Sequence, residues 1–278
     1  MIKQLTNAEY QAHDGLSHSE LMLLQNSPAD LIWSKNAPID TSKTSVFDFG
    51  TAVHTALLEP ELMDKTLHVS GFKGRTTQGF LKDVAENPDK IVLTESEVEQ
   101  LQIMVASCKA HPTFNFYMNL VGDNESSIFA EDKDRGIMLK CRADRDCVAN
   151  LLQADSLLCD VKTTANLDDW RSDKEWINPL FKYGYGLQAC HYLNVSSLHY
   201  SFDINKFVFL VLSKSASFGR YPVGVFEITR DELELMGFWQ QYQANLDTYA
   251  ECKANEDWIS CEHFNFGGEQ IEITEIAE

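Results

Sequence analysis

The chain has 278 residues, of which 44% are hydrophobic and 23% charged, a composition typical of an ordinary globular protein. Its length suits one large domain or two small ones, and its apolar runs fall well short of the roughly 20 residues that span a bilayer. The N-terminal sequence MIKQLTNAEYQAHDG lacks the apolar centre of a secretory signal. We therefore expect a cytoplasmic protein with no membrane partner.

The net charge of −19 disfavours a protein that holds nucleic acid on a generally basic surface. The charge is uneven, because residues 231–278 carry twelve acidic residues and one basic residue, Lys253. Residues 1–230 therefore hold −8 of the charge, which leaves room for a local basic groove there. The seven cysteines are scattered and include no C-x-x-C pair, so we expect reduced thiols and no zinc ribbon.

The first part of the chain, to about residue 120, is predicted to be helical. Ser17 begins an S-x-x-E capping box before an apolar run, which predicts a helix N-terminus. A second helix is expected in DFGTAVHTALLEPELM. A third follows a second capping box at Thr94 and ends near Pro112. Residues 71–90, rich in Gly, Lys and Thr, are expected to form an exposed loop.

From about residue 121 the pattern changes to short apolar or alternating runs with turn residues between them. Three neighbouring antiparallel strands are predicted in ESSIFAED, GIMLKCRADRDCVA and SLLCDVKTT. A helix is expected from about Asn178 to Ser196, then strands in KFVFLVLSK and YPVGVFEIT and a closing helix in DELELMGFWQQYQANLDTYAEC. This order predicts one α/β domain with a mixed sheet, in which residues 121–230 form the sheet core and residues 231–278 an acidic helix and tail.

Asp160 and Lys162 stand two residues apart at the end of the apolar run LLCDVKTT. On a strand such positions face the same side, about 6.5–7 Å apart, while Val161 points into the core. Burying charged groups is costly unless they are paired or bound to a metal. Taken alone, D-x-K is a weak pattern that also describes a surface salt bridge on an exposed edge strand.

The preceding strand ends in CRADRD and offers two carboxylates, Asp144 and Asp146. Pairing of the two strands would bring one of them beside Asp160. Two carboxylates and a lysine at one strand edge suit Mg²⁺, because hard divalent ions take oxygen ligands. The metal could polarise a phosphoryl group and lower the pKa of a bound water, and Lys162 could orient that water or stabilise the developing charge.

These stretches resemble the nuclease domain of the exonuclease VIII (RecE-type) family, a RecB-like group of the PD-(D/E)xK superfamily. The resemblance runs in order along about residues 15–230, through GLSHSEL, WSKNAPIDTSKT, FGTAVHTALLEP, ESSIFAED, KCRAD, DVKTTA, FVFLV and GRYPV. It implies the restriction-endonuclease-like α/β fold, with a mixed central sheet flanked by helices.

The resemblance places the family's metal-binding histidine on His54, its two aspartates on Asp144 and Asp160, and its lysine on Lys162. The CR-x-D context favours Asp144, but Asp146 stays open as the ligand. The spacing from Asp144 to Asp160 is longer than the family pattern, so we expect a small insertion in the hairpin RDCVANLLQADS.

Further site residues come from the same resemblance. The family's Q-x-x-x-Y pattern falls on Gln188 and Tyr192, one helical turn apart, and implies contact with the substrate backbone and support of the site. Glu125 could add a carboxylate to the metal site from the neighbouring strand. Ser17 and Ser19 mark a helix N-terminus whose free amides could bind a DNA phosphate, although capping explains Ser17 equally well.

By this resemblance the protein is a Mg²⁺-dependent exodeoxyribonuclease that degrades linear double-stranded DNA from 5′ to 3′, with Mn²⁺ able to substitute. The product would be a 3′ single strand for a RecT-like annealing protein in phage-type recombination, and a ring-shaped homo-oligomer would enclose the duplex. The aromatic residues Phe238, Trp239 and Tyr242 of the last helix are candidates for a subunit interface or for the core.

Two other functions stay open. A catalytically inactive protein of the same fold could act as an acidic DNA mimic or an interaction module, although a mimic needs neither the lysine nor the histidine of a metal site. A RecB-like nuclease with an iron–sulfur cluster is disfavoured by the scattered cysteines.

Overall fold

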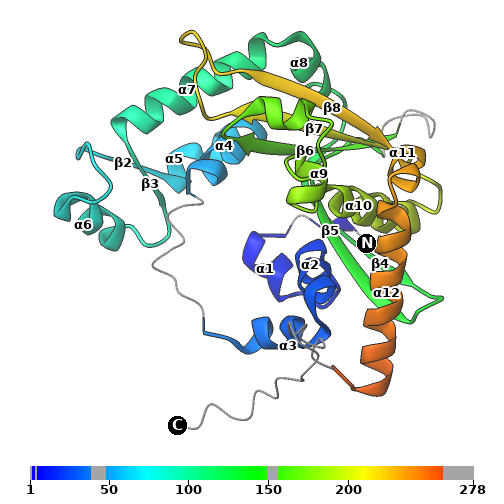
Figure 1. Ribbon diagram of the computed structural model, residues 1–278. Helices are drawn as coiled ribbons and strands as arrows, with labels where there is room; N and C mark the ends of the chain where they lie inside the picture. The colour runs from blue at the N-terminus through cyan, green and yellow to red at the C-terminus, as the bar shows by residue number, and fades with distance from the viewer. Residues whose placement is uncertain (1, 4, 39–47, 149–155, 259–278) are drawn as a thin grey trace, which may run out of the picture.

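The computed structural model describes residues 2–3, 5–38, 48–148 and 156–258, and Figure 1 shows how their elements are arranged. The strands of the main sheet are β1 Ile2–Lys3, β4 Asp123–Asp132, β5 Ile137–Asp146, β6 Leu157–Thr164, β7 Lys206–Ser213 and β8 Val223–Thr229. Their order across the sheet is β1-β4-β5-β6-β7-β8. β6 pairs with β7 in parallel, and the other neighbours are antiparallel. The predicted mixed sheet is therefore confirmed, as are its three antiparallel neighbours β4, β5 and β6.

Helices cover both faces of this sheet (Figure 1). One face packs against α2 His18–Asn26, α3 Pro28–Asn36, α10 Tyr185–Tyr200 and α12 Phe238–Asn255. The other packs against α4 Asp48–Leu58, α7 Glu95–Ala110 and α8 Pro112–Met118. β6 and β7 run between the two layers, so their apolar runs are continuous. An ionisable side chain on the buried part of β6 must therefore find a partner inside the protein.

Shorter elements complete the described part of the chain. These are α1 Asn7–Ala12, η2 Pro60–Leu62, α5 Met63–Thr66, η4 Leu167–Arg171, α9 Pro179–Lys182 and α11 Arg230–Leu235. Both predicted capping boxes are present, at Ser17 before α2 and at Thr94 before α7. The apolar run after Ser17 forms two helices, because Ser27 caps a new helix that has Pro28 in its first turn.

The prediction of an exposed loop over residues 71–90 is wrong in its centre. Residues Gln78–Glu86 form the helix α6, whose N-terminus is capped by the Thr77 hydroxyl. This helix connects β2 Leu67–Ser70 to β3 Ile91–Thr94, which pair in parallel as a second, two-stranded sheet. Phe80 is buried and anchors α6, so the Gly, Lys and Thr content of the segment misled the prediction.

Two of the predicted later helices are each interrupted by a glycine with positive φ. Gly184, with φ 69°, separates α9 from α10, and Gly237, with φ 83°, separates α11 from α12. A Cβ at Gly184 would lie 2.5 Å from the side chain of Met22 on α2, so this junction allows a close approach between the two helices. Chain direction thus changes immediately before α10, the helix that carries Gln188.

The aromatic residues of α12 belong to the core. Phe238, Trp239 and Tyr242 are 4%, 8% and 0% exposed and pack in the cluster that covers the α10 face of the sheet. They therefore serve the fold of one chain and are not available to a subunit interface. The expected hairpin insertion falls on residues 149–155, outside the described residues, as do residues 259–278 of the acidic tail. Every helix among the described residues is too short or too polar to cross a membrane.

Candidate active site

The candidate site lies where β5 and β6 diverge. The two strands are paired at Arg145–Cys159 and at Asp146–Leu158. Beyond these pairs, the Asp144 Oδ2 atom accepts a hydrogen bond from the backbone N–H of Val161 on β6 at 2.6 Å. A side-chain carboxylate thus satisfies a backbone donor at the point where the ladder opens, and the opening brings Asp144 close to the charged residues of β6.

Asp160 and Lys162 point to the same side of β6, as the strand periodicity predicts. Asp160 is 3% exposed; its Oδ2 lies 2.5 Å from Lys162 Nζ, and its Oδ1 accepts a hydrogen bond from Gln188 Nε2 at 2.7 Å. Val161, between them, is buried in the core on the opposite face. The predicted pairing of the buried charges is therefore present, with α10 supplying an amide donor as well.

Burial and pairing act in opposite directions on these two groups. Burial raises the pKa of Asp160, and the ammonium group of Lys162 only partly offsets that increase. Burial alone would lower the pKa of Lys162, but Asp160 and Asp144 raise it above its ordinary value. Lys162 is consequently protonated at neutral pH and can act as a positive charge beside a phosphate, not as a proton acceptor.

A second cluster joins β5, β4 and α4. His54 Nδ1 lies 3.3 Å from Asp144 Oδ2, and Glu125 stands on β4 opposite Asp144. Burial alone would lower the pKa of His54, but Asp144 and then Asp160 raise it to about 9. Burial also opposes ionisation of Asp144, yet His54 holds the pKa of that carboxyl below its usual range. In the metal-free protein these two residues therefore form an ion pair.

Glu125 has an unusual backbone conformation, and its carboxyl group is only partly ionised near neutral pH. Its φ is 53°, in the left-handed region that non-glycine residues seldom adopt, and its carboxylate lies 2.9 Å from Arg142 Nε. Burial and the nearby Asp144 raise the pKa of Glu125 to about 7, against the influence of Arg142. Crowding of acids at this place indicates a site that would gain from a divalent cation.

The three residues fit such a cation. His54, Glu125 and Asp144 each offer a ligand atom, and these atoms lie within 4.8 Å of one another, so that one ion could contact all three. Two carboxylates and one imidazole suit Mn²⁺ and, with added waters, Mg²⁺. Asp160 stands outside this group, because its oxygens face Gln188 and Lys162. Each of these oxygens keeps a further lone pair, so Asp160 could still contact an ion or its bound waters while it holds both partners.

The structure separates the two aspartates that the sequence left open. Asp146 Oδ2 accepts a hydrogen bond from the Tyr200 hydroxyl at 2.7 Å, and its Oδ1 accepts one from the Val148 N–H at 3.1 Å. Asp146 is thus turned toward α10 and fully engaged, whereas Asp144 faces His54. The geometry supports Asp144 as the ligand.

The other predicted residues lie around this centre in different roles. Gln188 is 5% exposed and holds Asp160, while Tyr192 packs edge-on against Phe207 at 5.9 Å. The Ser17 hydroxyl caps α2 and donates to Glu20 Oε2 at 2.7 Å, whereas Ser19 is exposed. Support of the site by Gln188 is therefore visible, and the contacts of Ser17, Ser19 and Tyr192 with DNA remain predictions.

Two neighbours of the site were missed from the sequence. Arg142, the ion partner of Glu125, is two residues before Asp144, so the period of two along a strand could have placed it on the same side. Tyr185 lies with its ring centroid 4.7 Å from Lys162 Nζ and is three residues before Gln188 on α10. The helical spacing of three could have indicated that it shares a face with Gln188.

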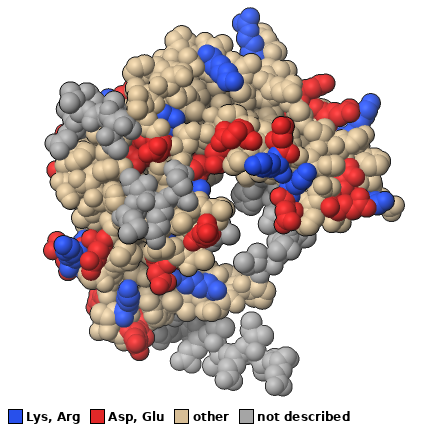
Figure 2. Space-filling view, turned by 180° about the vertical axis from the view of Figure 1, so that it is seen from behind, with Lys and Arg blue, Asp and Glu red and all other residues tan. Residues whose placement is uncertain are grey.

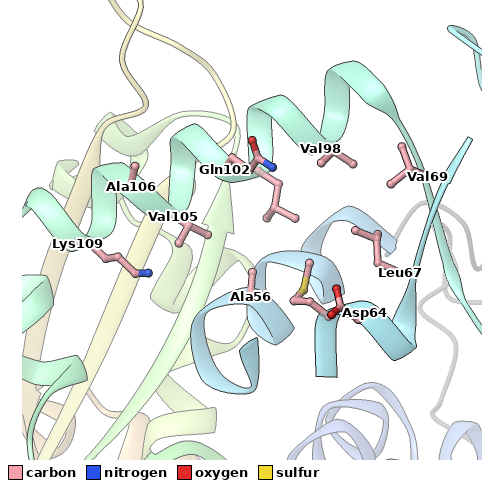
Figure 3. A pocket seen from close by; sticks show the side chains of 11 residues that line it. Ala56, Asp64, Leu67, Val69, Val98, Gln102, Val105, Ala106 and Lys109 are labelled. Carbon is pink, nitrogen blue, oxygen red and sulfur yellow. The ribbon is translucent and has the colours of Figure 1, made fainter. Parts of the chain in front are cut away.

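Figure 3 shows a separate cavity of about 520 Å³ between α7 and the α4–α5 segment. Its walls are mostly apolar, with Asp64, Gln102 and Lys109 as polar members, and they include none of the predicted site residues. Ala56 of α4 lines it, two residues after His54. The cavity therefore lies behind the helix that supplies the histidine, apart from the charged cluster.

Charged side chains of both signs surround a hollow on the face shown in Figure 2. Acidic residues are interspersed with lysines and arginines there, and the described residues form no extended basic surface on this face. The basic groove that the uneven charge allowed is thus not seen on this side. Binding of a polyanion on this face would depend on individual cationic side chains.

Comparison with known proteins supports the fold described above. A model of the family described as "PDDEXK-like domain of unknown function (DUF3799)" matches residues 17–269. No curated protein matches the chain. Among solved structures, a "Putative exonuclease" from Eubacterium rectale has a TM-score of 0.62 at 14% identity, over 93% of this chain and 89% of that one. A phage-related exonuclease from Haemophilus somnus 129PT has a TM-score of 0.35 at 11% identity, over 89% and 99% of the two chains.

Proposed function

This chain belongs to the family of PDDEXK-like domains of unknown function (DUF3799), and we propose that it is a divalent-metal-dependent nuclease that hydrolyses DNA. The family match and the mixed α/β sheet support the PD-(D/E)xK nuclease fold. The observation that carries the proposed activity is the charged cluster at the divergence of β5 and β6. There the buried Asp144 and Asp160 lie close to the partly buried Lys162, His54 and Glu125.

Each residue of the cluster has a role in this reaction. A divalent cation held by His54, Glu125 and Asp144 would polarise the phosphodiester and make a bound water more acidic. Lys162, which remains protonated, would orient the attacking water or stabilise charge that develops on the phosphate oxygens. Gln188 keeps Asp160 in place and so fixes the position of the Lys162 ammonium group.

The finer assignments rest on the resemblance to the RecE-type family. We propose Mg²⁺ as the physiological ion, with Mn²⁺ as a substitute, and linear double-stranded DNA as the substrate. Hydrolysis from 5′ to 3′ would leave a 3′ single strand for a RecT-like annealing protein in the cytoplasm. A ring-shaped homo-oligomer would keep the enzyme on its substrate despite the net charge of −19, which weakens non-specific attraction to DNA.

The deciding experiment uses linear duplex labelled at the 5′ or the 3′ end, with a covalently closed circle of the same sequence as the control. We expect Mg²⁺-dependent loss of the 5′ label as mononucleotide, early retention of the 3′ label, and an intact circle. Loss of the 3′ label first would reverse the polarity. Absence of any hydrolysis with Mg²⁺ or Mn²⁺ would reject the nuclease and favour the non-catalytic alternative.

The oligomer is tested separately by light scattering. A particle mass that is a multiple of the 31.5 kDa chain mass would support the ring, and a strict monomer at micromolar concentration would reject it. Because Phe238, Trp239 and Tyr242 are core residues, an interface has to be built from other surfaces. Cleavage by a monomer would leave the nuclease assignment intact.

A further inference from the structure

A continuous chain of ring and cation contacts leads from the candidate site to the surface. Lys162 Nζ lies 4.7 Å from the ring centroid of Tyr185, and the Tyr185 ring lies 5.7 Å from that of Tyr183. Tyr183 is 51% exposed, and Lys182 Nζ lies 5.0 Å from its ring centroid. The chain therefore begins at the partly buried Lys162 of the candidate site and ends at a solvent-exposed aromatic ring with a cation beside it.

This chain is held rigidly from behind. The ring of the buried Trp170 stacks on Tyr185 at 5.6 Å with an interplanar angle of 22°. Phe181, two residues before Tyr183, packs on Phe238 of α12 at 4.7 Å, which fixes α9 to the core. In Figure 1 α9 lies beside β6 and the start of α10. Tyr183 is thus presented on an ordered support, so a ligand that stacked on it would not have to order the protein first.

A second exposed aromatic residue precedes α9 on the same segment. Trp176 is 74% exposed, and Lys174 Nζ lies 6.0 Å from its ring centroid. Large aromatic side chains that alternate with lysines at the surface are the arrangement by which proteins hold unpaired nucleic-acid strands. Each ring offers a stacking face to a base, and each lysine lies where a backbone phosphate could approach.

We propose that Tyr183 and Lys182 form a platform for an unpaired nucleotide of the strand being cut, with Trp176 and Lys174 continuing the path outward. The proposal rests on the nuclease function inferred above. The substrate class that it adds is single-stranded DNA, either as a free strand or as the frayed end of a duplex. A base inside a duplex is already stacked on both faces, so only a terminal or unpaired base can stack on Tyr183.

Electrostatic attraction alone would bind DNA only weakly at this surface. The same segment carries Asp168, Asp169, Asp173 and Glu175, which counter the lysines and weaken attraction to phosphates. Stacking must therefore supply most of the affinity, and that contribution is independent of base identity and less sensitive to salt. The salt dependence of binding therefore distinguishes the platform from a basic groove, whose affinity for DNA would fall steeply as the salt concentration is raised.

The test measures binding without cleavage, using the full chain with a chelator and a short fluorescein-labelled single-stranded oligonucleotide. We expect Tyr183→Ala to weaken binding about tenfold, in line with the loss of one base–aromatic stack. Tyr183→Phe keeps the ring and should bind within about twofold of the wild type. Phe116→Ala is the matched control, because Phe116 is 58% exposed and its ring packs on Tyr117 of α8 at 5.2 Å, on a different helix from this chain of rings.

Hydrolysis with Mg²⁺ provides the second readout. Tyr183→Ala should raise KM for a duplex with a frayed end about tenfold, with little change in kcat, and should abolish any preference for frayed over blunt ends. Binding and KM equal to wild type in Tyr183→Ala would overturn the platform while leaving the nuclease intact. Loss of binding in Tyr183→Ala would uphold the platform even if the wild type failed to hydrolyse DNA. An equal loss in Phe116→Ala would overturn it as a non-specific surface effect.

Discussion

Two aspartates on β5 show how differently one strand can treat the same side chain. Asp144 and Asp146 are 7% and 2% exposed. Asp146 is satisfied by neutral donors, the Tyr200 hydroxyl and the Val148 N–H, and burial raises the pKa of its carboxyl. Asp144 is held by His54 and by one backbone N–H, and the imidazolium keeps its pKa low.

The two acids differ in whether their partners can be exchanged. Asp146 has a fixed set of hydrogen bonds, and removing a partner would leave a buried acceptor unpaired. The main partner of Asp144 is ionisable and belongs to the same candidate ligand set, so a metal could take the place of a proton on His54. Burial of a carboxylate is therefore uninformative by itself, whereas the exchangeability of its partner indicates a metal site. Four changes test this comparison.

The largest effect is expected from Asp160→Ala. Removing this carboxylate frees Lys162 from its partner and takes one acid out of the cluster, so hydrolysis should fall by about 10³-fold or more. The fold should persist, but thermal stability without metal should fall because Lys162 and Gln188 each lose a partner. End-labelled duplex assays and thermal unfolding measure the two. Activity within a few-fold of wild type would remove Asp160 from the mechanism.

Lys162→Ala should have the next largest effect, about 10²-fold on turnover, because a cation beside the phosphate is lost. Metal affinity should be nearly unchanged, since an ammonium group is not a ligand. Isothermal calorimetry with Mn²⁺ gives the affinity and a single-turnover assay gives the rate. A drop in metal affinity of about tenfold or more would show that the lysine acts by organising the ligands.

Metal affinity should rise with pH by up to about tenfold per pH unit below pH 9, and should level off above it. The pKa of His54 is raised to about 9, so the ion must displace a proton at neutral pH. In the apoprotein the sign is opposite: the stabilisation from protonated His54 is complete below about pH 6.5 and is lost as pH rises through about 9. Isothermal calorimetry at a series of pH values measures the metal affinity, and thermal unfolding of the apoprotein over the same range measures its stability. In His54→Gln the metal affinity should depend less on pH. An unchanged slope would exclude His54 as a ligand.

The smallest effect is expected from a change at Tyr200, whose hydroxyl group is a partner of Asp146. Tyr200→Phe leaves Asp146 Oδ2 without its hydroxyl donor and should cost about 1–3 kcal/mol of stability, a fall of a few degrees in Tm. Hydrolysis per folded molecule should be unchanged. Loss of activity comparable to that in Lys162→Ala would mean that Asp146 takes part in the site and that the contrast between the two aspartates is wrong.

Local patterns in the sequence predicted much of this arrangement. The capping boxes at Ser17 and Thr94 begin helices as expected, because they depend on neighbouring residues alone. The period of two placed Asp160 and Lys162 on one side of β6. Grouping His54 with Asp144 came from the family resemblance, since nothing local connects a histidine on α4 with an acid on β5.

The sequence predictions were incomplete or wrong where packing between distant residues determines the structure. The CR-x-D context favoured Asp144 but left Asp146 open, because the choice depends on Tyr200 from α10 and on where β5 and β6 separate. The helix around Phe80 was hidden by a loop-like composition, since one buried aromatic side chain and the Thr77 cap stabilise it. The ring contacts of Tyr185 and Tyr183 depend on the turn at Gly184, which a helix prediction across residues 178–196 passes over.

The positive φ of Glu125 has a consequence for how this chain can change over generations. Glycine and asparagine adopt that backbone conformation readily, whereas glutamate costs roughly 1 kcal/mol there. Glycine or asparagine at position 125 would remove that backbone cost, but each would leave Arg142 without its carboxylate partner. A glutamate persists only where selection for the carboxylate outweighs that cost. Under the proposed nuclease function, relatives of this chain that keep the activity should accordingly keep an acidic residue at position 125.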